Sequence, residues 1–533
     1  MNRFYVIGLV LLISTAWSLP ILFGYLTTPP NSVTPTKFLG WIRSDDFHRY
    51  GSFIDQTRYE NRILYLDNSA VEPQSPRMIA VYFFILGLSG KIFPLSAQSL
   101  WLISLFVVTS LFMITLLRAL KAWTSDISLQ YMALFLILFS GGLEFFAVKA
   151  GISFPREKNF WMDGFSTFCS FHNPLKIAGI ASVLWLLLTW KAYLETGKTK
   201  FLATTFLIIL FSWSIHPNSA IPGYLALVST IFSKAFLPFS IRSSLRKIIK
   251  TYLPLLIPFG MIGIYIMWMQ SDSTTAGIIK QYNIRNLVEP FRYYPLRYGL
   301  MFPFGVVGCL ISMRERTILS TLMAGWWIGS EMFAHVSGMS GLLFQHMIHL
   351  PMALFASIPL IKIVRSNTCM KWVVPGVLGL SFFIQNTWVI VKVIDQTEKD
   401  VWPTSLYWSE GEIEAAEELR GYPRGNVLAS RDSGNKIGWL ALKPSFLGHW
   451  GTTPARREKE REFNRFFDSR TSNAWRRDFI GRYQIQYIWY GPNEKRVGIL
   501  DYMLPLTPII DNDTVTIFRV LHSENISATS SNS

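Results

Sequence analysis

The sequence predicts an α-helical polytopic membrane protein of about 11 transmembrane helices, followed by a C-terminal α/β domain outside the membrane. Only 16% of the 533 residues are charged and the mean hydropathy is +0.29. A soluble chain carries roughly 25% charged residues. Apolar runs of about 20 residues, the length that crosses a bilayer core, recur to about residue 392 and then stop. A soluble or disordered chain is excluded.

The apolar runs predict eleven spans. The first run follows Arg3 as a signal peptide would, but it is too long and no A-x-A site follows, so we interpret it as a membrane anchor. The expected spans lie near residues 4–26, 98–117, 128–148, 173–190, 201–216, 218–238, 251–270, 297–312, 317–336, 342–361 and 372–391.

The loops between these spans predict the orientation. The apolar run at 78–90 is too short to cross a bilayer comfortably, so we place it at the interface. One set of loops then holds 16 basic residues against three acidic ones, which assigns it to the cytoplasm. We therefore expect an integral protein of the bacterial inner membrane with a cytoplasmic N-terminus. The long loop 27–97 and the C-terminal domain are expected outside.

Residues 394–533 are expected to form a soluble domain, separate from a transmembrane domain at 1–393. They hold 18 basic and 19 acidic residues, so they offer no basic face for nucleic acid. Strand-like runs alternate with helix-like runs, which is typical of a small α/β domain. These runs are GNVLAS, DSGNKIGWLA, KPSFLGHW, REKEREFNRFFDS, NAWRRDFIGRY, IQYIWYGPNE and TVTIFRVL. The tail after them is expected to be disordered.

Two adjacent carboxylates, Asp45 and Asp46, follow the first span in the run WIRSDDFHRYGSFIDQTR. Carboxylates beside a membrane are costly to desolvate, so those that face a cavity are expected to pair with cations, metal or substrate. The apolar spacing after them predicts an amphipathic segment lying on the surface. The alternative interpretation is a helix cap, because Asp in a first turn complements the helix dipole.

This layout resembles the start of the GT-C glycosyltransferases. The features are an acidic pair after the first span, the loop YLDNSAVEPQSPR, a short juxtamembrane run ending in Gly-Lys-Ile, and a span ending in basic residues. The resemblance covers about the first 240 residues. It implies a membrane enzyme that takes a hexosyl or pentosyl group from a polyprenyl-phosphate carrier, as protein O-mannosyltransferases and aminoarabinose transferases do.

The resemblance also implies the chemistry of the acidic pair. In the family an acidic residue of the first outer loop activates or positions the acceptor, and Asp45 and Asp46 both match that position. A carboxylate takes the proton of an acceptor hydroxyl while its oxygen attacks the anomeric carbon and the lipid phosphate leaves. The acceptor is expected at the outer face and is a lipid, a glycan or a protein.

The second outer loop offers Asp163 and His172 as substrate-binding candidates. Close relatives of the aminoarabinose transferases would have Asp beside the Pro that opens the fourth span, where this chain has Asn173. His172 is suited to a phosphate or a metal ion. A histidine that caps a helix is an equal alternative.

Three further histidines lie at outer ends of spans: His216 in SIHPNSAIPGY, and His346 with His349 in FQHMIHLPMA. Histidines three apart share a helix face and are able to share a ligand. No dense metal-binding spacing such as HExxH is present, so a divalent metal ion stays open as a cofactor. The alternative is that each histidine satisfies backbone groups.

Two more candidate contacts lie in the loop before the eighth span and in the C-terminal domain. Arg292 and Arg297 alternate with tyrosines and are suited to clamp a lipid phosphate. A snorkelling aromatic belt explains them equally. In FLGHWGTTP a strand leading into Gly448 is expected to present His449 and Trp450 to a sugar, the alternative being a packed Trp450.

Two other functions compete with a glycosyltransferase. A transporter or flippase of the same lipid-linked saccharide would show broken helices and ionisable groups at mid-membrane, whereas here charges gather at the outer ends of the spans. An envelope sensor would use the membrane part only as an anchor, for which eleven spans are many more than needed.

Overall fold

The structure is a computed structural model in which the chain divides into two compact units. The first unit comprises residues 1–19, 102–266 and 283–399, and the second comprises 20–101, 267–282 and 400–533. The residues described are 6–16, 32–33, 44–151, 173–233, 241–283, 294, 298–335, 345–366, 369–398, 408–500 and 504–521.

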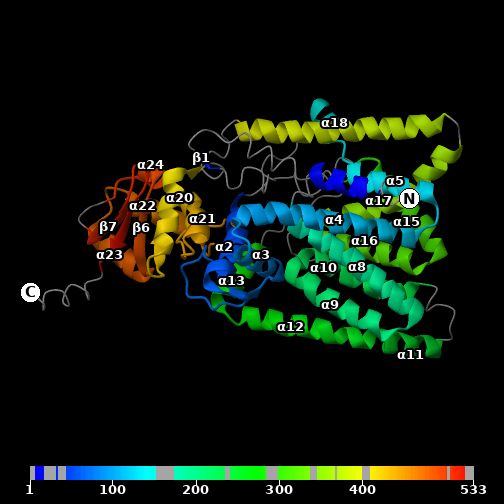
Figure 1. Ribbon diagram of the computed structural model, residues 1–533, viewed down its shortest axis with the longest axis horizontal. Helices are drawn as coiled ribbons and strands as arrows, with labels where there is room; N and C mark the ends of the chain where they lie inside the picture. The colour runs from blue at the N-terminus through cyan, green and yellow to red at the C-terminus, as the bar shows by residue number, and fades with distance from the viewer. Residues whose placement is uncertain are drawn as a thin grey trace, which may run out of the picture. The chain divides into compact units, whose positions relative to one another are not determined.

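The first unit is helical (Figure 1). Each of the eleven predicted spans overlaps a helix, of which the first covers Val6–Ala16. The others, with the short segments between them, are α4 (Ala97–Trp123), α5 (Ile127–Phe139), α6 (Glu144–Lys149), α8 (Pro174–Thr196), α9 (Thr199–Ile215), α10 (Pro217–Ser229), η1 (Thr230–Phe232), α11 (Ile241–Tyr252), η2 (Leu253–Leu255), α12 (Leu256–Gln270), α15 (Met301–Glu315), α16 (Ile318–His335), α17 (Gln345–Ser366) and α18 (Met370–Glu398).

Four helices among the described residues are long and apolar enough to cross a membrane. They cover Ala97–Trp123, Pro174–Thr196, Leu245–Gln270 and Met347–Ser366. The chain therefore belongs to the general class of integral membrane proteins. The number of eleven spans and their orientation stay predictions.

Local sequence explains where these helices begin and how closely they pack. Asn173 caps α8 by accepting a hydrogen bond from the backbone N–H of Leu175, and Pro174 occupies the first turn. Glycine allows close helix contacts, because a Cβ on Gly305 of α15 would lie 2.8 Å from Cγ of Met352 in α17. Small residues at these contacts are typical of helices that associate in membranes.

The C-terminal part of the second unit is an α/β domain (Figure 1). Its sheet has the order β5-β6-β8-β7, in which β5 is parallel to β6 and the other pairs are antiparallel. The strands are β5 (Asn426–Leu428), β6 (Ile485–Tyr490), β7 (Leu506–Asp511) and β8 (Thr516–Val520). The helices are α20 (Glu410–Arg420), α21 (Arg431–Leu440), α22 (Arg456–Phe467), α23 (Asn473–Arg482) and α24 (Pro492–Val497).

The predicted α/β alternation is confirmed, with one correction. The amphipathic runs become α22 and α23, and their phenylalanines join the core beside β6. The strand predicted to lead into Gly448 is wrong, because residues 441–455 form turns with a single parallel bridge between Ser445 and Val427. A short apolar run carries too little periodicity to identify a strand.

The first loop contributes helices to the same unit. Its elements are β1 (Ser32–Val33), α2 (Ser44–Glu60), β2 (Leu64–Tyr65), β3 (Met78–Ile79) and α3 (Val81–Ile92), and the unit also includes β4 (Trp408–Ser409) and α13 (Ser273–Asn283). The twelve-residue helix α3 is about 18 Å long at 1.5 Å per residue. It is too short to span, as the run at 78–90 predicted.

Helix α2 is buried between its neighbours. Phe47, Phe53 and Ile54 are all 1% exposed or less, so the expectation that this segment lies on the surface is wrong. Glycines permit the close approach: a Cβ on Gly51 would lie 2.6 Å from the Trp439 indole of α21. The first loop and the C-terminal region therefore build one core around α2.

Candidate functional site

Asp46 lies in the first turn of α2, and its carboxylate is held by a buried histidine. Nε2 of His449 lies 2.7 Å from Oδ1 of Asp46, and the histidine side chain is 1% exposed. Nδ1 of His449 accepts a hydrogen bond from the backbone N–H of Gly451 at 3.3 Å. In the neutral ring the proton then lies on Nε2, which donates to Asp46. The imidazole therefore orients a carboxylate that is 29% exposed.

The turn that carries His449 is held against the first loop. The Thr453 hydroxyl lies 3.2 Å from the carbonyl oxygen of Ser69 and 3.0 Å from that of His449. It also accepts a hydrogen bond from the N–H of Gly448. A Cβ on Gly448 would lie 2.9 Å from Cβ of Ser69, so only glycine fits without a shift. The contacts of Gly448 and Thr453 with Ser69 thus hold His449 in place.

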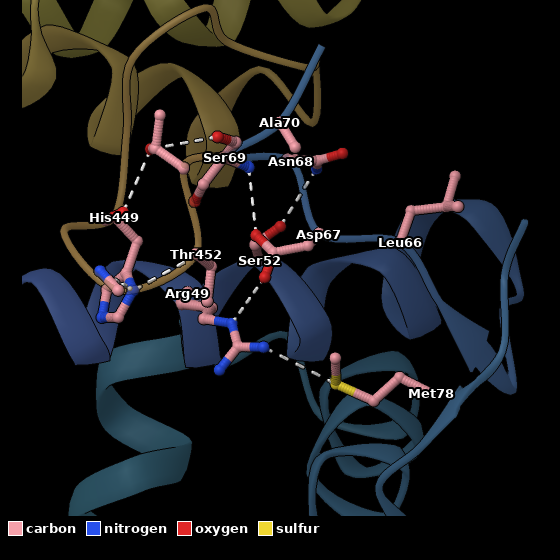
Figure 2. A network of polar contacts seen from close by, with 12 residues as sticks. Arg49, Ser52, Leu66, Asp67, Asn68, Ser69, Ala70, Met78, His449 and Thr452 are labelled. Atoms are coloured by element: carbon pink, nitrogen blue, oxygen red, sulfur yellow. Dashed lines mark hydrogen bonds and ion pairs between the residues drawn. The ribbon is translucent and has the colours of Figure 1, made fainter. Parts of the chain in front are cut away.

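An ion pair lies one helical turn beyond Asp46. Nε of Arg49 lies 2.9 Å from Oδ2 of Asp67, whose side chain is 4% exposed (Figure 2). The other oxygen of Asp67 accepts the backbone N–H of Ser69. The guanidinium also reaches Sδ of Met78. Arg49 therefore joins α2 to both ends of the segment 66–78.

His48 follows Asp46 by two positions in α2 and lies among aromatic rings. Its ring centroid is 4.9 Å from that of Trp408 and 6.0 Å from that of Trp439. Burial, together with the positive charge of Lys436, lowers the pKa of His48 to about 3. The imidazole is therefore neutral at physiological pH.

A buried ion pair supports this aromatic cluster. Nζ of Lys436 lies 2.7 Å from Oε1 of Glu412, and the two side chains are 2% and 7% exposed. The ammonium group also lies 5.3 Å from the ring centroid of Trp408. Glu412 closes a capping box with Ser409 at the start of α20. This carboxylate thus serves both a helix end and a buried cation.

Asp55 makes stability depend on pH. Its carboxylate accepts a 2.7 Å hydrogen bond from Nε1 of Trp439, and burial raises the pKa of Asp55 to about 6. An unfolded Asp titrates near about 4. Between these two pKa values the folded state keeps a proton that the unfolded state loses. The free energy of unfolding that Asp55 contributes is therefore fully present below about pH 4 and is lost as the pH rises through about 6.

We therefore expect Asp55→Asn to stabilise the protein at neutral pH relative to wild type. Asn keeps an oxygen for Trp439 and has no proton to lose. The gain in unfolding free energy should be absent near pH 4, grow toward about pH 6 and then stay constant. Urea titrations of the full chain at several pH values, read by pulse proteolysis, measure it. A gain that does not change with pH would contradict the assignment.

Several residues predicted for the site lie outside the described part of the structure. For Asp45 and His346 only the backbone is described, as part of α2 and α17. The remaining candidates outside the described residues are Asp163, His172, Arg292 and Arg297. Their roles stay predictions.

Two predicted histidines contact backbone groups in the first unit. His216 precedes α10, and its Nδ1 accepts the backbone N–H of Ser219 at 3.2 Å. Nε2 of His349, which is 8% exposed, lies 3.3 Å from the carbonyl oxygen of Ile137. The alternative given for such histidines, satisfaction of backbone groups, describes both contacts. Their substrate-binding roles stay predictions.

The described residues do not fit a metal centre. None of their His, Cys, Asp and Glu side chains gather in a group of three or more able to hold an ion. Asp46 and His449, the best pair of donors, bond directly to each other. A divalent metal ion as cofactor stays a prediction.

Several residues of the site were missed by the sequence analysis. His48 and Arg49 follow the acidic pair directly, and the i, i+3 spacing of Asp46 and Arg49 would have placed them near one face of a helix. Asp67, Glu412 and Lys436 carry no local signal, because their partners lie 18 or 24 positions away on other elements of the fold.

The fold is similar to that of solved oligosaccharyltransferases, in agreement with the predicted resemblance to the GT-C glycosyltransferases. The similar solved structures include the oligosaccharyltransferase of Archaeoglobus fulgidus, tethered with an acceptor peptide containing the NVT sequon. It aligns over 92% of this chain and 69% of its own length, with a TM-score of 0.52 and 12% identity. Its apo form aligns over 92% and 70%, with a TM-score of 0.53 and 11% identity.

A second similar protein is ArnT from Cupriavidus metallidurans. Its apo structure covers 90% of this chain and 95% of its own length, with a TM-score of 0.47 and 11% identity. No protein-family model and no curated protein sequence matches the chain.

Proposed function

We propose that this chain is a glycosyltransferase that moves a hexosyl or pentosyl group from a polyprenyl-phosphate carrier to an acceptor at the outer face of the membrane. One observation carries the proposal: in a chain with the GT-C fold, Asp46 opens α2 and is oriented by the buried His449. The A. fulgidus oligosaccharyltransferase has been solved with an inhibitory peptide and a dolichol-phosphate, which supports a lipid-phosphate carrier here.

In the proposed mechanism Asp46 or its neighbour Asp45 accepts the proton of an acceptor hydroxyl. The hydroxyl oxygen forms a bond to the anomeric carbon as the bond from that carbon to the phosphate oxygen breaks, and the electron pair leaves with the lipid phosphate. Direct displacement inverts the anomeric carbon. The hydrogen bond from His449 fixes the carboxylate plane, which reduces the orientational freedom lost on reaching the transition state.

His449 is therefore a positioning residue. We expect His449→Phe to lower kcat about 10- to 100-fold, because a hydrogen bond to a charged group contributes about 1.5–3 kcal/mol. His449→Gln should recover much of the loss, since its amide N–H is able to donate to Asp46. The measurement is the transfer kinetics of both variants, at a temperature well below the melting temperature of either one. Equal losses in the two variants would indicate a structural role only.

The proposed orientation has its own test. We expect a cysteine at Leu245, in α11, to be protected from an impermeant maleimide in intact cells and labelled after the cells are opened. The background is a chain in which Cys169, Cys309 and Cys369 are serine. Labelling in intact cells would reverse the predicted orientation.

The experiment that tests the function separates transfer from lipid movement. The full chain is placed in proteoliposomes that hold polyprenyl-phosphate-linked sugars and a crude acceptor fraction of the cell envelope. A glycosyltransferase releases polyprenyl phosphate in proportion to the sugar gained by acceptors. Movement of the intact donor between leaflets without such release would establish the competing flippase instead. The contributions of Asp163, His172, His216, Arg292, Arg297, His346 and His349 to substrate binding stay predictions.

A further inference from the structure

A small polar pocket lies in the second unit beside the site. It lies between residues 48–53 of α2, the segment 67–69 and α21. Its lining is polar apart from one aromatic ring and one glycine. The lining residues are His48, Arg49, Ser52, Phe53, Asp67, Asn68, Ser69, Asn435 and Gly438. The free space is small and fits about one water molecule or one hydroxyl group.

Two buried polar groups of this lining have no hydrogen-bond partner among the residues that the structure describes. They are the imidazole of His48, at both ring nitrogens, and Nδ2 of Asn435. The two residues are 2% and 4% exposed. Buried polar groups are nearly always paired, so unpaired ones beside a pocket indicate a group that enters it. Other lining polar groups are already bonded, among them Asn68, which donates to Ser52 and to the carbonyl of Gly438.

The two unpaired groups define the chemistry of what enters. A neutral imidazole offers one donor and one acceptor, and the Asn435 amide offers a donor. A hydroxyl group donates and accepts at once, so it is able to donate to the acceptor nitrogen of His48 and to accept from Nδ2 of Asn435. A carboxylate or phosphate oxygen only accepts and leaves the acceptor nitrogen of His48 unpaired.

The charges around the pocket also favour a neutral group. Arg49 is paired with Asp67 at 2.9 Å, and Lys436, adjacent in sequence to Asn435, is paired with Glu412 at 2.7 Å. Each cation is balanced by a carboxylate that is nearly fully buried. An anion would therefore meet no net positive charge in exchange for its lost hydration.

We propose that this pocket binds one hydroxyl group of a sugar ring, held by His48 and Asn435 and presented beside Asp46. The choice of a sugar rests on the proposed function. The position of the pocket on α2, within one turn of Asp46, makes it a specificity-determining subsite: a sugar that has no hydroxyl at the matching ring position leaves His48 and Asn435 unpaired.

The test uses the full chain in lipid nanodiscs, which avoid glycoside detergents. The probes are the methyl glycosides of mannose, glucose, galactose, arabinose and xylose, with their single-position deoxy analogues, observed by saturation-transfer NMR. We expect at least one glycoside to bind and one deoxy analogue of it to lose binding at least tenfold. His48→Phe, which keeps a ring between Trp408 and Trp439, and Asn435→Leu should each abolish the signal.

The controls separate this inference from the proposed function. Tyr422→Phe removes a hydrogen bond to the Ile509 carbonyl, away from the pocket, and should leave binding unchanged. Asp46→Asn should keep glycoside binding, so loss of transfer in that variant with intact binding concerns only the catalytic assignment. The inference is overturned if no glycoside binds, if His48→Phe and Asn435→Leu bind as wild type does, or if inorganic phosphate displaces the bound glycoside. Should His48→Phe fail to fold, Asn435→Leu decides alone.

Discussion

Asp46→Asn is expected to lower the rate of sugar transfer by about 10²- to 10⁴-fold, the usual contribution of a general base. Asparagine has the same shape and retains an oxygen that accepts the 2.7 Å hydrogen bond from Nε2 of His449. The side chain therefore stays in place but no longer takes up a proton. The measurement is single-turnover transfer from a polyprenyl-phosphate sugar by purified full chain in nanodiscs.

Two further substitutions complete this experiment, one at the neighbouring Asp45 and one at the distant Asp468. Asp45→Asn, tested alone and together with Asp46→Asn, decides which carboxylate is the base. Asp468→Asn is the control, because Asp468 is paired with Arg470 away from the site and should transfer as wild type does. Wild-type rates in both single variants and in the double variant would show that the acidic pair is not catalytic.

Lys436→Met is expected to destabilise the second unit by about 3–5 kcal/mol, because it leaves the buried carboxylate of Glu412 without its cation. Methionine fills a volume similar to that of the lysine stem, so little of the loss comes from a cavity. Neighbouring structure is affected as well, since the ammonium group also contacts the Trp408 ring. The measurement is the urea midpoint of the full chain by pulse proteolysis at a site in the C-terminal region.

A double variant distinguishes the effect of the unpaired charge from the effect of the changed side-chain shape. Adding Glu412→Gln to Lys436→Met removes the orphaned charge while keeping a side chain that is able to close the capping box with Ser409. The double variant should therefore recover most of the lost stability. The exposed pair of Arg470 and Asp468 is the matched control, and Arg470→Met should change the midpoint little. A double variant as unstable as Lys436→Met would contradict the account.

The candidate site was predictable from the sequence only in part. The acidic pair is predictable because two carboxylates follow an apolar span, and that signal is local. The sequence also indicates His449, but as a residue that a strand end presents to a sugar. The structure instead buries it against Asp46, 403 positions earlier in the chain. Nothing in the run FLGHWGTTP indicates that partner, since the contact depends on the turn that Ser69 and Thr453 hold.

The sequence by itself determined the general class of protein, the positions of the apolar helices, the shortness of α3 and the α/β character of the C-terminal region. These features follow from hydropathy and periodicity, which neighbouring residues set. Only the tertiary structure decided that α2 is buried against α21, that Lys436 and Glu412 form a buried pair and that His48 and Asn435 line one pocket. The residues of α2 and α21 that pack together, like His48 and Asn435, lie hundreds of positions apart, and Lys436 and Glu412 lie 24 positions apart on different helices, so the chain has to fold before they meet.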